Sequence, residues 1–518
     1  MSTDLPASTA LPRRTPWLIA PLVAAAPLCV AALFFADGNV VLALAPLAGV
    51  GALVFMLLGR LRTSAMLLLF AALFLENTPE RPANGLWQSP LFPLGALLFD
   101  KLNNVTGIHA LRFTGIDAAV ALLGGVALYR RWHGNAIDRR GQVETARPLR
   151  QAALVSVVTL LGLWAYGLAT GGDFQNSLWQ IQKPLYASLL FLLFQASFTG
   201  ARDHALLARI VVIAALWKAL IAFYVTHKLH LPEEELPYVN THSDSVLYAT
   251  ACTILIAAFM LRPSRARLFR CMGVLPILAA AMVVNNRRLV WVEMAAVLAV
   301  LLVFMPRTRI KRMLARAAVI SAPFLALYLA IGWDSTAPLF RPAATVRSVV
   351  SSKSDSSARS RDVENFNLVM TTDAHMLVGA GFGHEYDEVV KGDDISHAFP
   401  QYRYIPHNSL LGLWSFGGLL GYTGLTALLS VGAFMAARTF RMAQAPDDRA
   451  AAFVVLAVIV IYLLQAYGDM GVFSWLNDFI VASALASVGK LAVAVGAWPS
   501  RRAVPAIAQS MSLAEVSP

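Results

Sequence analysis

Long apolar stretches alternate with short polar connections along most of the chain. Each stretch is about the length, roughly 20 residues, that crosses a hydrocarbon core as a helix. A lone strand would leave backbone groups without hydrogen-bond partners in lipid, so helices are expected. The pattern predicts an all-α polytopic membrane protein with about fourteen transmembrane helices, or twelve to fourteen because three stretches are short. They begin near Trp17, Val40, Leu61, Phe113, Ala152, Pro184, Leu206, Ser245, Met272, Leu289, Ala315, Asn408, Ala450 and Val472.

Two apolar stretches need a separate interpretation. The first, Trp17–Phe35, follows Arg13 and Arg14 but is too long for a typical signal-peptide core, so we interpret it as a retained helix. The stretch Leu91–Phe99 is about half a span, which predicts a re-entrant or interfacial segment.

Composition agrees with the membrane interpretation. Of 518 residues, 58% are hydrophobic and 14% are charged, whereas soluble proteins have about 25% charged residues. The net charge of +12 does not require a nucleic-acid partner, and none is expected, because the basic residues cluster in short loops as the positive-inside rule predicts. The three cysteines are odd in number and form no CxxC motif, which argues against a disulfide framework or a zinc site.

Loop charge sets the predicted orientation. With the N-terminus in the cytoplasm, the cytoplasmic side receives 26 Lys and Arg residues and the opposite side 14, seven of them in one long loop that the rule discounts. The richest cytoplasmic stretches are Arg130–Arg150, Arg262–Arg270 and Arg307–Arg316. The sequence therefore predicts a helix bundle over residues 1–331 (about eleven helices), a large outer loop over 332–406, about three helices over 407–493 and a disordered cytoplasmic tail over 494–518.

Four motifs lie on the outer side in this topology. The first is Asn285-Asn-Arg-Arg288, a tight connection whose arginines oppose the charge trend. One interpretation is a polar hairpin whose arginines reach the lipid headgroups. The other is a guanidinium pair that binds phosphate in a bidentate fork.

The second and third motifs lie in the large loop. Ser357-Ala-Arg-Ser-Arg361 precedes an expected amphipathic helix, and by itself it is typical of a solvated helix start with Ser360 as cap. Gly379-Ala-Gly-Phe-Gly-His384 permits positive φ and close backbone approach. No strand–helix unit surrounds these glycines, so they favour a turn over a dinucleotide site.

The fourth motif is Pro406-His-Asn-Ser-Leu-Leu, continued by a helix with Gly417 and Gly421. Asn408 is a suitable N-cap, and glycines four apart allow close helix packing in membranes. His407 then lies at the positive end of a helix dipole, which favours a neutral imidazole able to accept a proton from a hydroxyl. The alternative is a histidine that anchors the chain at the membrane interface.

Taken in this order, the four motifs resemble the O-antigen ligase and O-antigen polymerase superfamily, most closely over residues 285–421. The resemblance implies a GT-C-like glycosyltransferase of the bacterial inner membrane that acts at the periplasmic face, without metal or cofactor. His407 would be the catalytic residue, and Arg287 and Arg361, or their neighbours Arg288 and Arg359, would bind the diphosphate of an undecaprenyl-diphosphate-linked glycan.

Further residues are expected around this centre. Asn408, Tyr404, Arg403, His384 and Asp469 are candidates for contact with the acceptor or for support of the catalytic residue. Glu293, within a predicted span, is interpreted as a structural partner of one of the arginines, since intramembrane charges are generally paired. Expected partners are the lipid-linked donor, a glycan acceptor and membrane lipids, with a chain-length regulator and a flippase as further candidates.

Two positions depart from the family pattern. Asn365 stands where an aromatic residue is common four positions after the loop arginine, and Trp414-Ser-Phe416 stands where a Glu commonly precedes the glycine. The leading expectation is a polysaccharide polymerase that works by inverting single displacement. A ligase that transfers the glycan to lipid A core or protein is the nearest alternative. A lipid-glycan flippase is the alternative from another class, and it predicts internal repeats that this sequence does not display.

Overall fold

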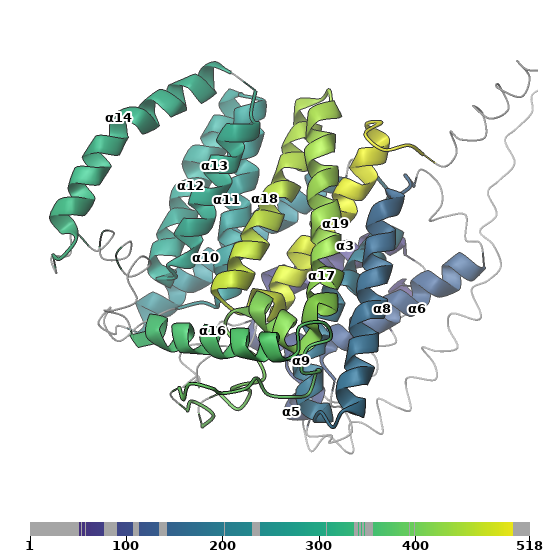
Figure 1. Cartoon of the computed structure of the whole chain (residues 1–518). Coiled ribbons are helices and arrows are strands. Elements are labelled where there is room, and N and C mark those ends of the chain that lie inside the picture. Colours follow the sequence, from purple (N-terminus) through teal and green to yellow (C-terminus); the bar gives the residue numbers. More distant parts are fainter. Residues whose placement is uncertain are drawn as a thin grey trace, which may run out of the picture.

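The computed structural model of the chain describes residues 51–52, 54–56, 59–76, 91–106, 113–133, 142–200, 203–229, 239–306, 308–335, 340, 343, 347, 356–392, 394–397 and 399–500. These residues form helices joined by turns, and they contain no sheet (Figure 1). The helices are α3 (Leu61–Phe74), α4 (Phe92–Phe99), α5 (Leu102–Thr106), α6 (Gly115–Trp132), α8 (Arg147–Ala169), α9 (Phe174–Ser197), α10 (Asp203–Leu229), α11 (His242–Leu261), α12 (Arg265–Asn285), α13 (Leu289–Phe304), α14 (Arg309–Gly332), α16 (Ser356–Ala374), α17 (Ser409–Met442), α18 (Pro446–Gly468), the 3₁₀ turn η4 (Gly471–Phe473) and α19 (Trp475–Ala494).

Eight of the described helices are long and apolar enough to cross a membrane: α8, α10, α11, α12, α14, α17, α18 and α19. Two shorter apolar helices, α3 and α13, stand at predicted spans as well. The prediction of an all-helical, multi-pass membrane protein is therefore confirmed at this level. The predicted spans that begin near Trp17 and Val40 lie outside the described residues or extend only into short described pieces.

The bundle has two chemically different ends. At one end, called the basic end below, Asp447 at the start of α18 forms ion pairs with Arg262 and Arg267, at 2.8 and 2.7 Å. At the other end, called the site end, α11, α17 and α19 begin and α12 and α18 finish. Helix α16 crosses the site end (Figure 1). It is not amphipathic in the expected way, because its buried residues include Glu364, Asn367 and Thr371 while Phe366 and Val369 are exposed. The connection that carries Arg262 and Arg267 and the four sequence motifs thus lie at opposite ends of the bundle.

Helix α17 is interrupted at Gly418, which has φ 61° and ψ −167°. The segment after α16 satisfies the backbone groups that this break exposes. The N–H of Ala380 donates to the Ser415 carbonyl at 2.8 Å, and the N–H of Leu419 donates to the Met376 carbonyl at 2.8 Å. A broken helix is tolerated within a membrane protein only where neighbouring chain supplies such bonds. The break therefore fastens the large loop to the bundle.

Three sequence expectations need correction. Helix α9 begins at Phe174, ten residues before the expected start at Pro184, because its polar first half is held by hydrogen bonds to the large loop rather than by lipid. Helix α16 begins at Ser356, so Ser360 lies within the helix and does not cap it. The expected disordered tail over 494–518 is ordered at its beginning, since the Ala497 carbonyl accepts a 2.6 Å bond from Arg438 Nε; residues 501–518 lie outside the described part.

Helix α14 stands apart from the rest (Figure 1). None of its most apolar 18-residue window is buried inside the protein. Because the helix is long and apolar, lipid is the environment that suits this exposure.

Candidate active site

His407 is held at the site end by Glu364 of α16. Nδ1 of His407 lies 3.1 Å from Glu364 Oε2, and the backbone N–H of His407 donates to the same oxygen at 3.1 Å. The Glu364 side chain is 10% exposed and that of His407 31%. A carboxylate that accepts the Nδ1 proton leaves the lone pair on Nε2, so Nε2 is the nitrogen that can take up a proton.

The helix after His407 begins as predicted. Asn408 is the N-cap of α17, and its Oδ1 accepts the N–H of Leu411 at 3.2 Å. Its Nδ2 is buried and has no hydrogen-bond partner among the described residues. Ser409 Oγ donates to the carbonyls of Ala466 and Asp469, at 2.8 and 3.2 Å, which ties the start of α17 to the end of α18.

Arg361 lies one helical turn before Glu364, so the two side chains share one face of α16. Arg361 Nη1 donates to the Gly468 carbonyl at 2.9 Å, while its Nε is buried without a hydrogen-bond partner in the described structure. Asn365, one turn beyond Arg361, also belongs to this face, and its Oδ1 is buried and unpartnered. A guanidinium with an unused buried donor on the helix face that holds His407 is suited to bind an anion.

The turn that carries Arg287 and Arg288 reaches the same place through Gly468. Leu289, the residue after Arg288, packs so closely on Gly468 that a Cβ there would lie 2.9 Å from Leu289 Cδ2. The Gly468 carbonyl in turn holds Arg361. Arg287 and Arg288 are half-buried, and Asn286 of the turn has a left-handed φ of 51°. Arg359 is exposed on α16. The geometry thus distinguishes Arg361, which faces the bundle, from Arg359.

Asp469 is buried between two cationic groups. It forms an ion pair with Nδ1 of His242 at the start of α11, and its side chain is 5% exposed. Although burial raises the pKa of Asp469, the charges of His242 and Arg361 lower it further, so that the net pKa is below its ordinary value. The sequence suggests that Asp469 contacts an acceptor sugar. The structure instead directs its carboxylate inward, where it fixes His242 and faces Arg361.

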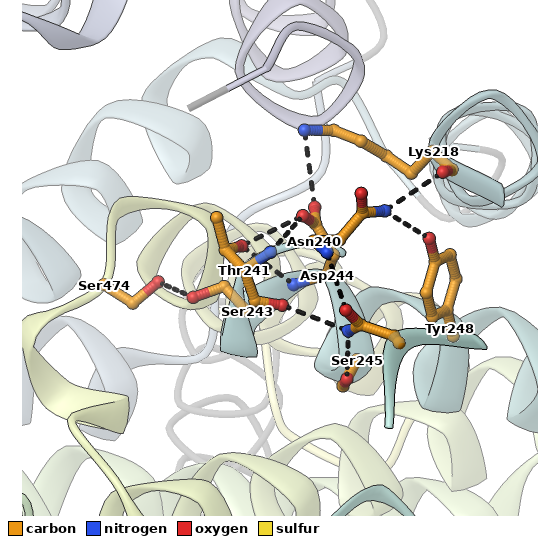
Figure 2. A network of polar contacts seen from close by, with 9 residues as sticks. Lys218, Asn240, Thr241, Ser243, Asp244, Ser245, Tyr248 and Ser474 are labelled. Atoms are coloured by element: carbon orange, nitrogen blue, oxygen red, sulfur yellow. Dashed lines mark hydrogen bonds and ion pairs between the residues drawn. The ribbon is translucent and has the colours of Figure 1, made fainter. Parts of the chain in front are cut away.

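A network of polar contacts surrounds the start of α11, the helix whose first residue is His242 (Figure 2). Asp244 forms a capping box with Thr241 and an ion pair with Lys218 at 3.3 Å. Ser243 forms a short hydrogen bond with Ser474, next to the start of α19. Every residue from Thr241 to Ser245 is therefore bonded to another element or to the helix cap. These bonds hold the backbone at His242 in position.

The same network anchors the arginine turn. Asn285 Oδ1 accepts the N–H of Asn240 at 2.7 Å, and its Nδ2 donates to Ser245 Oγ at 3.0 Å. The conformation of Arg287 and Arg288 is thus tied to the segment that presents His242.

Glu293 does not form the expected pair with an arginine. Both of its carboxylate oxygens are buried without a hydrogen-bond partner among the described residues, and its electrostatic neighbour is Asp469.

The glycine motif forms a turn with a structural role. A Cβ on Gly379 (φ +74°) would lie 2.3 Å from the Phe416 backbone, and Gly167 of α8 would clash with Phe382 in the same way. His384 Nε2 lies 3.2 Å from Thr170 Oγ1, at the end of α8. The ring of His384 bonds to the end of α8 and makes no contact with His407. The predicted role of His384 near the acceptor therefore stays a prediction.

Arg403 and Tyr404 precede His407 in the large loop and bond to other parts of the chain. Arg403 has a left-handed φ of 70° and pairs with Glu385 at 2.9 Å. The Tyr404 carbonyl accepts from Gln180 Nε2 at 3.0 Å. Burial and the nearby Glu385 carboxylate raise the pKa of the Tyr404 hydroxyl. Both side chains are half-exposed, so a ligand can reach them.

Sequence reasoning missed Glu364 and considers His242 only as a candidate metal ligand, for which its loop shows no ligand spacing. Glu364 had one detectable signal, its spacing of three residues from Arg361 on an expected helix. His242 had only its place in a loop on the outer side. Comparison with protein-family models gives no match, and comparison with curated proteins gives none either.

Proposed function

We propose that this chain is a membrane glycosyltransferase that moves a glycan from undecaprenyl diphosphate to a sugar hydroxyl. The observation that carries the proposal is the Glu364–His407 pair beside Arg361, on one face of α16 and at the end of the bundle away from the basic connections. The order of motifs that resembles the O-antigen ligase and polymerase superfamily supports the same conclusion.

The reaction follows from these groups. Nε2 of His407 takes the proton of the acceptor hydroxyl while the oxygen attacks the anomeric carbon of the donor. The bond from that carbon to the diphosphate oxygen breaks, and undecaprenyl diphosphate leaves with the electron pair. Arg361, with Arg287 or Arg288 across Gly468, offsets the charge that develops on the diphosphate. One displacement on one face inverts the anomeric configuration.

The membrane setting is part of the proposal. About fourteen helices would cross the bacterial inner membrane, with the basic end in the cytoplasm and the site end at the periplasmic face. A diphosphate on a polyprenyl tail would then lie at the level of the lipid headgroups. The arginines of the site end would lie at the same depth. A chain-length regulator and a flippase would act beside it.

A polymerase that extends the glycan with lipid-linked repeat units is the leading assignment. The alternative is a ligase that delivers the glycan to lipid A core or protein, for which the chemistry is identical. A cell that lacks the gene distinguishes the two. Single repeat units on the lipid or the cell surface indicate a polymerase, whereas long chains retained on the carrier indicate a ligase.

The enzyme is distinguished from a flippase with purified protein in vesicles that contain undecaprenyl-diphosphate-linked oligosaccharide. We expect the wild type to lengthen or transfer the glycan and to release undecaprenyl diphosphate. His397→Ala, which changes an exposed histidine of the same loop, should retain this activity. Movement of intact donor between leaflets without any new glycosidic bond would contradict the proposal and favour the flippase.

A further inference from the structure

A cavity opens near the basic end of the bundle, away from His407 at the site end. It has a volume of about 470 Å³ and is lined by α10, α11, α12, α18 and α19. Away from its rim, the cavity is lined mostly by apolar side chains such as Val212, Ile254 and Val454. None of its lining residues belongs to the site described above. A cavity of this size suits a ligand chain or a small amphiphile.

The rim of this cavity has an excess of positive charge. Arg209, Arg267 and Arg270 line it, opposed by Asp447. Asp447 is already paired with Arg262 and Arg267. Arg209 and Arg270 are exposed and form no hydrogen bond or ion pair within the part of the chain that the structure describes. Two guanidinium groups are therefore available at the mouth of an apolar cavity.

A polar atom inside the cavity supplies an independent indication of a ligand. Thr250 is 1% exposed and lines the cavity, yet its hydroxyl has no hydrogen-bond partner among the described residues. It lies two helical turns, or roughly 12 Å, along α11 from Ala258 at the rim. A buried hydroxyl without a partner is uncommon and requires an explanation. An ester oxygen of a bound lipid would accept its proton.

We infer that this cavity binds an anionic phospholipid. The phosphate would lie between Arg209 and Arg270, and an acyl chain would follow the apolar wall. Basic pockets between transmembrane helices at the cytoplasmic side bind acidic headgroups in this way. A zwitterionic lipid would bring its own cation to a rim that already has unpaired arginines, so charge complementarity selects the anionic class. The inference does not depend on the reaction proposed for the site end.

The test measures lipid binding to the purified, delipidated full chain. Dioleoyl phosphatidylglycerol and dioleoyl phosphatidylcholine, which share their acyl chains, are titrated separately and followed by native mass spectrometry and thermal unfolding. We expect phosphatidylglycerol to bind at least about tenfold more tightly, since each basic residue near a headgroup contributes roughly a factor of five. The double variant Arg209→Gln/Arg270→Gln should lose this preference.

The matched control is Arg265→Gln/Arg441→Gln, which removes two exposed arginines that do not line the cavity. It should bind phosphatidylglycerol as the wild type does. Equal binding of both lipids by the wild type would overturn the inference, as would wild-type preference in the Arg209/Arg270 variant. Equal stabilisation by inorganic phosphate alone would also overturn it, because that result describes a simple anion site.

Discussion

The carboxylate of Glu364 holds both the ring and the backbone of His407, with Oε2 lying 3.1 Å from Nδ1 and 3.1 Å from the backbone nitrogen. A single carboxylate therefore fixes the position of the residue and the tautomer of its imidazole. The same helix carries Arg361 one turn earlier. Helix α16 therefore sets the distance between His407, the proposed base, and Arg361, which is proposed to bind the diphosphate.

Replacing Glu364 with Gln should lower kcat by about tenfold or more, because the amide keeps the size but loses the charge that stabilises a protonated imidazole. The KM for the lipid-linked donor should change little, since Glu364 acts through His407 and does not touch the donor. Steady-state transfer assays with purified protein measure both. Asp373→Asn, on the exposed side of the same helix, is the control. A Glu364→Gln effect confined to KM would contradict the positioning role.

The two loop arginines should differ. Arg361→Gln is expected to weaken binding of the lipid-linked donor by about tenfold or more, because a charge-assisted bond to phosphate is lost. Arg359→Gln should leave the affinity within about twofold, since this side chain is exposed on α16. Donor titration against intrinsic fluorescence or by native mass spectrometry measures the affinities. Equal effects of both substitutions would argue against the assignment of Arg361.

Asp469 should contribute stability that depends on pH. Asp469→Asn leaves His242 without its buried partner, and we expect the free energy of unfolding to fall by about 3 kcal/mol at pH 7. The pKa of Asp469 is lowered in the folded state by its cationic neighbours, despite its burial. The stabilisation is therefore complete above the unfolded pKa of about 3.9 and is lost as pH falls below it.

Thermal unfolding of wild type and Asp469→Asn over pH 3 to 8 tests this dependence, with Asp448→Asn at the basic end as control. The difference in Tm should shrink as the pH falls below about 4, where the unfolded carboxyl group becomes protonated. A difference in Tm that grows on acidification would contradict a lowered pKa of Asp469 in the folded state.

Gly418 should be far less tolerant than its neighbour Gly417. Alanine at Gly418 combines a φ of +61° with a Cβ only 2.3 Å from the Leu377 backbone. At Gly417 the nearest atom to a new Cβ is the tip of the Phe382 ring, at 3.4 Å. We expect Gly418→Ala to cost about 2–3 kcal/mol more than Gly417→Ala. Chemical denaturation in detergent compares them, and equal stabilities would mean that α17 is not broken at Gly418.

Local signals in the sequence accounted for the elements but not for their connections. Apolar runs predicted the helices, and the cap at Asn408 followed from its side chain and the run after it. The break at Gly418 did not follow, because a Gly-Gly pair is equally compatible with close packing of an intact helix. Only the backbone of Met376–Gly381 determines that the helix opens there.

The candidate site shows the same division. Arg287 and Arg288 stand out in the sequence because they oppose the charge trend, and His407 because it precedes a helix, whereas Arg361 is indicated only by the family resemblance. The groups that hold them were not predicted, since the contact of His407 with the Glu364 carboxylate spans 43 positions and that of Arg361 with the Gly468 carbonyl spans 107. Asp469 is a candidate for acceptor contact in the sequence because it lies between the last two segments on the outer side, and nothing in its neighbourhood indicates His242 across the bundle. Pairing of this kind depends on tertiary packing.

The most direct test of the account is the rate of glycan transfer by His407→Ala under single-turnover conditions, with donor bound to saturation. The account predicts a rate about 100- to 10,000-fold below that of the wild type, with unchanged donor affinity and unchanged Tm. A rate equal to that of the wild type, or a decrease that is fully explained by weaker donor binding, would contradict the claim that His407 accepts the acceptor's proton.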